Sequence, residues 1–242
     1  MHPLTNLRRA TRFSVHLLRN FLLLPDCPVC HRPLVYPHEK LLCSRCRADL
    51  KPSGDPACPR CGRPVSRRGG ICVQCWQSPP PFSSTRCVSS YAGIFREVIL
   101  CYKYGGVSGL SRPLSRCLPP PPPADCVEDL LLVRVPDDPG RRRPFSPLGE
   151  MARRYARLHG LHYRSRALVK VRSTPRQAGL SLSARQRNLV GMFRCRSDLV
   201  KNRHVILLDD VFTTGCTLRA CAGELKRAGA KSVRVITLAR TP

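Results

Sequence analysis

Acidic and aromatic residues are scarce in this chain, and long apolar runs are missing. Aromatic side chains make up 6% of the 242 residues, with Trp76 as the single tryptophan, so no ladder of aromatics is available to stack the bases of a single-stranded nucleic acid. No apolar run approaches the roughly 18 residues of a membrane-spanning helix. The densest apolar cluster near the N-terminus, residues 21–24, is too short for a signal-peptide core, which argues against export. We therefore expect a cytoplasmic protein.

The shortage of acids leaves the chain strongly basic. It has 42 Lys and Arg residues against 15 Asp and Glu residues, for a formal net charge of +27. A charge of this size indicates an anionic partner, which is a phosphorylated small molecule, a nucleic acid, or both. The alternative is an arginine-rich composition shared by a whole proteome.

Cysteine, in contrast, is abundant. Eight of the 15 cysteines form four C-x-x-C pairs, in two sets whose pairs are separated by twelve and by ten residues. Four thiolates per set complete the closed tetrahedral shell of structural zinc, whereas a thioredoxin-like redox pair needs a strand-to-helix context that the sequence does not show. Thiols that must stay available as thiolates also indicate a reducing compartment. We predict two structural zinc ions, held by Cys27, Cys30, Cys43, Cys46, Cys58, Cys61, Cys72 and Cys75.

Composition divides the chain into four parts. Residues 1–24 carry a ragged amphipathic pattern, which predicts a docking helix, with a membrane-surface helix as the weaker alternative. Residues 25–76 form the predicted double zinc-ribbon module. Residues 77–82 are a stiff, proline-rich linker. Residues 83–242 form the main predicted domain.

Within residues 83–242, predicted strands and helices alternate. The patterns predict a helix through 95–102 that ends at Gly105, a strand over 130–135, a helix over 149–159 closed by Gly160, a strand at 166–171, a strand from Val205, a helix ending at Gly229 and a final strand over 232–238. This alternation predicts an α/β fold with a central, mostly parallel sheet. Five consecutive prolines, residues 119–123, predict an extended surface excursion, which is either a spacer or a ligand for a proline-binding module.

The run from Val205 to Thr217 carries the clearest functional signal. Four apolar residues end in two adjacent acids, which places the carboxylates at the C-terminal edge of a strand, where open α/β sheets bind ligands. A hydroxyl-rich turn follows at the start of a helix, whose N–H groups and dipole favour an anion. The candidate binding residues are Asp209, Asp210, Thr213, Thr214, Gly215, Cys216 and Thr217.

A second polar segment follows the strand at 166–171. It contains Arg172 and Arg176 within the string R-x-T-x-x-Q-x-G-L-S-x-x-x-R-x-x-N-x-x-G-x-F, which ends at Phe193. A loop of this length inside a compact domain is usually functional.

These motifs together resemble a known family. The 205–217 run resembles the PRPP (phosphoribosyl pyrophosphate) signature of type I phosphoribosyltransferases, and its combination with both cysteine sets and the basic string is similar to the competence protein ComF family. Members of that family join an N-terminal zinc module to a phosphoribosyltransferase-like domain. The resemblance therefore implies a type I phosphoribosyltransferase fold with a double zinc ribbon.

The resemblance also implies roles for individual residues. Asp209 and Asp210 would hold the ribose hydroxyls of PRPP, the turn would wrap its 5′-phosphate, and Mg²⁺ would bridge pyrophosphate and ribose oxygens. Arg172, Arg176 and Lys103 are candidates for stabilising the departing pyrophosphate, with an ordinary surface charge as the alternative for each. Where many relatives show R-G-F-N-Q, residues 143–147 of this chain read R-P-F-S-P, which leaves any ligand contact by an amide side chain there in doubt.

Three functions fit these features. The first is a phosphoribosyltransferase, which the PRPP-like run supports. The second is a nucleic-acid-associated competence factor that binds single-stranded DNA, which the net charge and the family resemblance support. The third is a docking protein of a DNA-uptake assembly with a helicase-like partner. The acceptor nucleophile and the oligomeric state are not assigned by any motif.

Overall fold

The structure is a computed structural model that describes residues 25–35, 41–122, 129–140, 145–172, 189 and 191–241. The chain forms two compact units, residues 1–50 and 51–242. The first unit contains the first four-cysteine set and the short helix α2 (Ser44–Ala48), and the second contains the other cysteine set and the whole α/β part. The predicted docking helix, residues 1–24, lies outside the described residues, and the predicted domain boundaries after residues 24, 76 and 82 stay predictions.

A parallel five-stranded sheet forms the centre of the second unit. The strand order is β1-β7-β6-β2-β3, and every neighbouring pair is parallel, which confirms the predicted α/β fold. The strands are β1 (Ser84–Ser90), β2 (Leu130–Arg134), β3 (His162–Tyr163), β6 (His204–Phe212) and β7 (Ser232–Arg240). Because all five strands are parallel, their carboxyl ends meet at one edge of the sheet.

Strand β6 lies in the middle of the sheet. Its residues from Val205 to Leu208 are each at most 1% exposed. A parallel strand that is covered on both faces reads as a continuous apolar run, which explains why the sequence pattern locates it so clearly. The strand continues through both acids and ends at Phe212.

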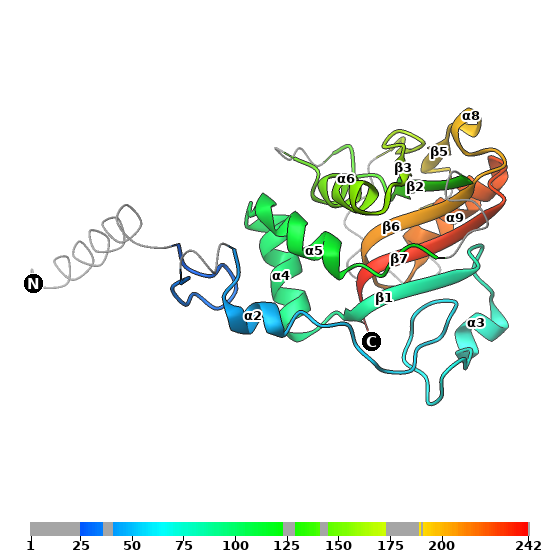
Figure 1. Cartoon of the computed structure of the whole chain (residues 1–242). Coiled ribbons are helices and arrows are strands. Elements are labelled where there is room, and N and C mark those ends of the chain that lie inside the picture. Colours follow the sequence, from blue (N-terminus) through cyan, green and yellow to red (C-terminus); the bar gives the residue numbers. More distant parts are fainter. Residues whose placement is uncertain are drawn as a thin grey trace, which may run out of the picture. The chain divides into compact units, whose positions relative to one another are not determined.

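Helices cover both faces of the sheet (Figure 1). Helix α9 (Cys216–Arg227) lies on one face, and α4 (Gly93–Tyr104), α5 (Ser111–Cys117) and α6 (Pro147–His159) lie on the other. Right-handed crossovers require this division, because the step from β6 to β7 runs along the sheet in the opposite direction to the steps from β1 to β2 and from β2 to β3. The shorter elements are α3 (Val73–Gln77), the 3₁₀ turn η1 (Ser108–Leu110), β4 (Leu168–Lys170), β5 (Phe193–Cys195) and α8 (Ser197–Val200).

Within residues 83–242 the predicted helices are confirmed, with small shifts at their ends. The apolar stripe of α4 is buried, and Gly105 follows the helix as expected. Helix α6 begins earlier than predicted, because the Ser146 hydroxyl accepts the Gly149 N–H at 3.0 Å and Pro147 occupies the first turn. It ends at Gly160, whose φ of 63° is left-handed.

One strand prediction differs from the structure. The strand expected at 166–171 is only β4, which pairs antiparallel with β5 in a separate two-stranded sheet. The prolines from 119 to 122 form neither helix nor strand, but the start of the run is fixed to the unit: the Pro119 carbonyl accepts from the Tyr155 hydroxyl at 2.7 Å, and the Pro120 carbonyl accepts from Arg86 at 2.9 Å. Strand β1, with its polar sequence, was not predicted, nor were α5, β3 and β5.

Candidate zinc centres and phosphoribosyl site

The first four-cysteine set forms one cluster in the first unit. The sulfurs of Cys27, Cys30, Cys43 and Cys46 all lie within 4.8 Å of one another. Two tight turns bring them together. In the first, the Cys27 N–H donates to the Arg32 carbonyl at 2.8 Å, and in the second the Cys46 N–H donates to the Cys43 sulfur at 3.4 Å.

The second set repeats this arrangement in the second unit. The sulfurs of Cys58, Cys61, Cys72 and Cys75 also lie within 4.8 Å of one another. The Cys58 N–H donates to the Arg63 carbonyl at 2.7 Å, and the Gly62 N–H donates to the Cys58 carbonyl at 2.7 Å. The pairing of the four C-x-x-C pairs into sites, which the sequence leaves open, is thus first with second and third with fourth in chain order.

Both clusters fit a zinc ion. With Zn–S bonds of about 2.3 Å, tetrahedral coordination places sulfurs about 3.8 Å apart, close to the 3.5 Å between Cys30 and Cys43 and the 3.6 Å between Cys61 and Cys72. Burial raises the pKa of Cys27, but backbone N–H groups outweigh it and lower the pKa to about 7. Four neighbouring sulfurs cannot all ionise without a cation between them, and a divalent ion supplies that charge.

The candidate phosphoribosyl site lies at the carboxyl edge of the sheet, where β6 ends. Successive side chains of a strand point to opposite faces, so Asp209 and Asp210 have different neighbours. Asp210 faces α4, where its Oδ2 atom lies 2.7 Å from the Lys103 Nζ. Burial and then the Asp210 charge raise the pKa of Asp209 to about 8, against the opposing effect of Lys103. Burial alone would lower the pKa of Lys103, but its attraction to Asp210 outweighs this and raises it.

The turn from Thr213 to Gly215 connects β6 to α9. Gly215 has a φ of 78° and directly precedes the first residue of the helix, Cys216. Within the described part of the chain, the hydroxyls of Thr213, Thr214 and Thr217 make no hydrogen bond, so these groups can accept a ligand. The turn thus presents hydroxyls and the positive end of a twelve-residue helix directly after two acids.

The structure does not bring every predicted cation to this turn. Lys103 lies near the turn because it forms an ion pair with Asp210, which comes shortly before the turn in the chain. Arg172 is exposed near Gly191 and makes no ion pair with either acid in the part of the chain that the structure describes. Arg176 lies outside the described residues.

The same sheet edge carries charged residues that the sequence reasoning missed. After β2, Asp137 pairs with Arg134 at 2.9 Å and Asp138 pairs with Lys170 at 2.6 Å. At the end of β7, Arg240 is only 5% exposed. A charged residue at the carboxyl end of a strand was the available signal, because in a parallel sheet such a residue lies at the ligand-binding edge.

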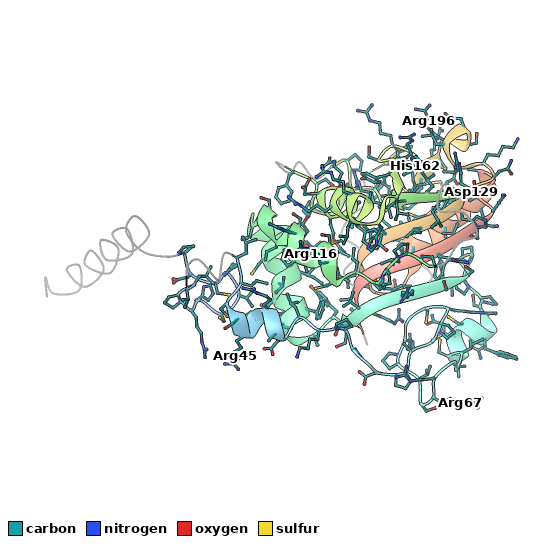
Figure 2. The ribbon with its side chains drawn as sticks, viewed as in Figure 1. Arg45, Arg67, Arg116, Asp129, His162 and Arg196 are labelled. Atoms are coloured by element: carbon teal, nitrogen blue, oxygen red, sulfur yellow. The ribbon has the colours of Figure 1, made fainter. Side chains whose placement is uncertain are left out.

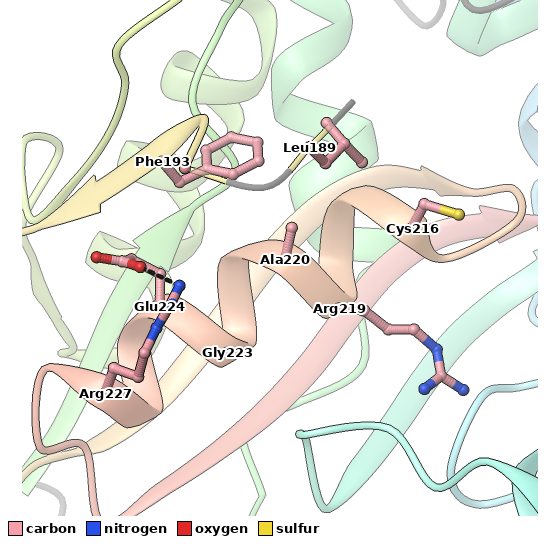
Figure 3. Close-up of a pocket in the computed structure, with 9 residues that line it drawn as sticks. Leu189, Phe193, Cys216, Arg219, Ala220, Gly223, Glu224 and Arg227 are labelled. Carbon is pink, nitrogen blue, oxygen red and sulfur yellow. Dashed lines mark hydrogen bonds and ion pairs between the residues drawn. The ribbon is translucent and has the colours of Figure 1, made fainter. Parts of the chain in front are cut away.

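A pocket of about 320 Å³ lies beside the turn, between α9 and the segment that ends the basic string (Figure 3). Leu189 and Phe193 lie over α9 opposite Ala220, and Cys216 lines the pocket at the N-terminal end of that helix. Cys216 is 5% exposed, as expected for a small buried side chain. Arg219 points away from the pocket and donates to the Ser78 carbonyl at 2.7 Å. The pocket is thus lined by Cys216 of the candidate site and by Leu189, Gly191 and Phe193 of the basic string.

None of the described helices combines the length and the apolar character needed to cross a membrane.

Comparison with solved structures gives short overlaps. Phosphoribosylpyrophosphate synthetase from Mycobacterium smegmatis is 25% identical, with a TM-score of 0.29, over 45% of this chain and 26% of that chain. Glutamine phosphoribosylpyrophosphate amidotransferase from B. subtilis is 22% identical, with a TM-score of 0.33, over 53% of this chain and 25% of that chain. The chain thus spans about a quarter of either structure.

Sequence comparison covers far more of the chain. Residues 18–76 match the double zinc ribbon domain, and residues 147–242 match the phosphoribosyl transferase domain. DNA utilization protein YhgH of Escherichia coli (strain K12) is 31% identical over 229 residues, which are 89% of this chain and 96% of the relative. Competence protein F of Haemophilus influenzae is 26% identical over 215 residues, 82% of this chain and 90% of the relative. The chain therefore belongs to the ComF/YhgH family, which includes these two relatives.

Proposed function

We propose that the segment from Asp209 to Thr217 binds PRPP together with Mg²⁺ and that the protein transfers its phosphoribosyl group to an acceptor. One observation carries this proposal: the turn after β6 presents unengaged threonine hydroxyls and the N-terminus of α9 directly beside two acids of the sheet edge. The match to the phosphoribosyl transferase domain supports the same assignment.

In this proposal each group has a defined task. The 5′-phosphate accepts hydrogen bonds from the turn, and the carboxylates of Asp209 and Asp210 accept them from the ribose hydroxyls. The acceptor forms a bond to the anomeric carbon while the bond from that carbon to pyrophosphate breaks, and pyrophosphate leaves with the electron pair. Mg²⁺ enters as part of the substrate, bound by the pyrophosphate and ribose oxygens, and helps to neutralise the leaving group.

The cations of the site differ in their starting positions. Lys103 is already paired with Asp210, so it must exchange partners to contact pyrophosphate. Arg172 and Arg176 of the basic string are the other candidates, and Arg176 lies outside the described residues. Residues Phe145 to Pro147 have structural tasks, because Phe145 packs 6.2 Å from Tyr102 and Ser146 caps α6.

Isothermal titration with PRPP and Mg²⁺ tests the binding step. We expect binding heat for the native protein, and a loss of affinity of about tenfold or more for Asp210→Asn, because charge-assisted hydrogen bonds contribute about 1.5–3 kcal/mol. Asp129→Asn removes an acid that pairs with Arg203 away from the site and serves as the matched control. Absence of heat at millimolar PRPP rejects the proposal, and pyrophosphate release in the presence of candidate acceptors separates turnover from binding alone.

The net charge favours a second function, which is binding of single-stranded DNA. Basic side chains project outward from opposite ends of the second unit, as Arg67 and Arg196 show (Figure 2). The relatives named for DNA utilization and competence favour the same substrate class. Proteins that bind through phosphates lose affinity steeply as salt rises.

Fluorescence anisotropy with a labelled single-stranded oligonucleotide at 50 and 200 mM salt tests this second function. Affinity should fall by about 300-fold or more between these salt concentrations if six or more phosphates are contacted, because the logarithmic slope is about −0.7 per phosphate for single strands. Undetectable affinity at low salt rejects it. A role as a docking protein predicts instead that a helicase-like partner is still captured by a variant with Asp209→Asn and Asp210→Asn. We place all three functions in the cytoplasm, where the eight cysteines stay reduced.

A further inference from the structure

The second zinc ribbon packs directly on the edge of the α/β sheet. The Ser53 N–H donates to the Val88 carbonyl at 2.8 Å, and the Thr85 N–H donates to the Pro59 carbonyl at 2.8 Å. The Thr85 hydroxyl also donates to the Arg60 carbonyl at 2.8 Å. Strand β1 pairs with β7 on one side, so these bonds satisfy groups of an edge strand.

Arg240 connects this ribbon to the middle of the sheet. It is 5% exposed, and its Nε and Nη1 atoms find no hydrogen-bond acceptor in the described part of the chain. A buried cation without compensation is strongly unfavourable. Two neighbours compensate it: the Phe212 ring, whose centroid lies 4.4 Å from the guanidinium carbon, and the second cysteine cluster.

The Arg240 side chain lies beside the backbone of the second ribbon, next to one of its four cysteines. A Cβ atom on Gly62, the residue after Cys61, would lie 3.7 Å from the Arg240 Cδ. Four thiolates around Zn²⁺ carry a net charge of −2, so the zinc-loaded ribbon provides the counter-charge that Arg240 otherwise lacks.

Phe212 transmits this contact to the turn. A Cβ atom on Gly215 would lie 2.6 Å from the Phe212 Cε1, so the ring forms the floor of the turn. The opposite support comes from the linker after the ribbon: Phe82 packs edge-on against Phe212 at 6.3 Å, and Arg219 of α9 donates to the Ser78 and Pro79 carbonyls. The second ribbon thus reaches the Thr213–Thr217 turn through Arg240 and Phe212, and the linker supports the same turn through Phe82 and through its bonds to Arg219.

We propose that the zinc-loaded second ribbon, acting through Arg240 and Phe212, fixes the Thr213–Thr217 turn in its anion-binding shape, so that zinc binding and phosphate binding are positively coupled. The identity of the anion as the PRPP phosphate rests on the proposed function, but the coupling of zinc to the turn does not. Arg240 and Phe212 are positioning residues in this scheme, because they act through the backbone of Gly215.

Hydrogen exchange of the full-length, zinc-loaded protein tests the coupling without any ligand. The peptide covering residues 212–218 should exchange about fivefold faster or more in Arg240→Met, since coupling between sites is typically 5–150-fold. Arg240→Lys, which keeps the charge, should preserve most of the protection, and Arg234→Met on the same strand is the control. The β2 peptide, residues 130–134, must stay protected in each variant, which excludes general unfolding. Unchanged exchange of residues 212–218 in Arg240→Met overturns the proposal.

A second measurement uses the reciprocal effect. PRPP with Mg²⁺ should slow the transfer of one of the two zinc ions to a chromophoric chelator by about fivefold or more, and Arg240→Met should abolish most of that effect. If calorimetry shows that PRPP binds but zinc transfer is unaffected, the coupling is wrong and the PRPP site stands. If PRPP does not bind, the proposed function is wrong, and hydrogen exchange alone decides the coupling.

Discussion

At the scale of single residues, Asp209 and Asp210 show what a sequence pattern can and cannot locate. The apolar run before them places both at the carboxyl edge of the sheet, because strand type and chain direction fix that position. It does not distinguish them, since their difference arises from neighbours that are far away in sequence. Asp210 meets Lys103 of α4, whereas Asp209 lies on the side of α9, where its charge adds to the effect of burial in raising the pKa of Cys221.

The raised pKa of Asp209, about 8, has a consequence for stability. An acid whose pKa is higher in the folded than in the unfolded protein binds more protons when folded, so it makes the folded state less stable as pH rises from about 4 to about 8. We expect Asp209→Asn, which keeps the acceptor for the Asp210 N–H, to melt at a higher temperature than the native protein, by a margin that grows over this pH range.

Thermal unfolding at several pH values, with zinc present, measures this difference. Asp129→Asn is the control and should give a difference that does not vary with pH. A margin for Asp209→Asn that is equally independent of pH would show that Asp209 is ionised throughout.

At the scale of elements, caps and turns set where each helix begins and ends. The turn before α9 needs a left-handed residue, and Gly215 supplies it with a φ of 78°. The sequence pattern predicts this glycine and the helix, because both signals are local. It does not reveal that Phe212 closes the turn from below, since that contact depends on which face of β6 the ring occupies.

Gly215, directly before α9, and Gly223, inside α9, form a matched pair of glycines. In Gly215→Ala the new Cβ would clash with the Phe212 ring at 2.6–2.7 Å in a strained backbone, so the variant should lose about 1–3 kcal/mol of stability together with PRPP affinity. Gly223 lies inside α9 with no atom within 4 Å of a new Cβ, so Gly223→Ala should gain about 0.5–1 kcal/mol. Urea unfolding measures both changes, and a stabilised Gly215→Ala would refute the close contact.

At the scale of the whole molecule, the motifs predict the modules better than their packing. The cysteine spacing predicts two equivalent zinc sites, because each needs only local turns. The structure shows that the two sites are not equivalent in context: residues 1–50 form one compact unit, whereas the second ribbon belongs to the same compact unit as the sheet. The bonds responsible come from backbone groups of Ser53, Pro59 and Arg60, and backbone carbonyls leave no signature in a sequence.

This asymmetry predicts different results from matched substitutions in the two ribbons. Cys72→Ser with Cys75→Ser removes the second zinc, and should loosen the hydrogen bonds to the edge strand β1 and the support of Arg240. Loss of a few hydrogen bonds of about 0.5–1.5 kcal/mol each should lower the melting temperature of the sheet-containing unit by about 5–10 °C, since 1 kcal/mol corresponds to about 2–4 °C at this size. Cys27→Ser with Cys30→Ser is the matched control, because its ligands belong to the other compact unit.

Elemental analysis should show that each variant retains one zinc ion, and circular dichroism at 222 nm should follow the melting of the helices. Equal loss of melting temperature in both variants would mean that the second ribbon has no special role in supporting the sheet. A selective loss in the second would explain why the zinc ribbon and the phosphoribosyl transferase domain occur in one chain, since the ribbon then completes the edge of the domain that carries the binding turn.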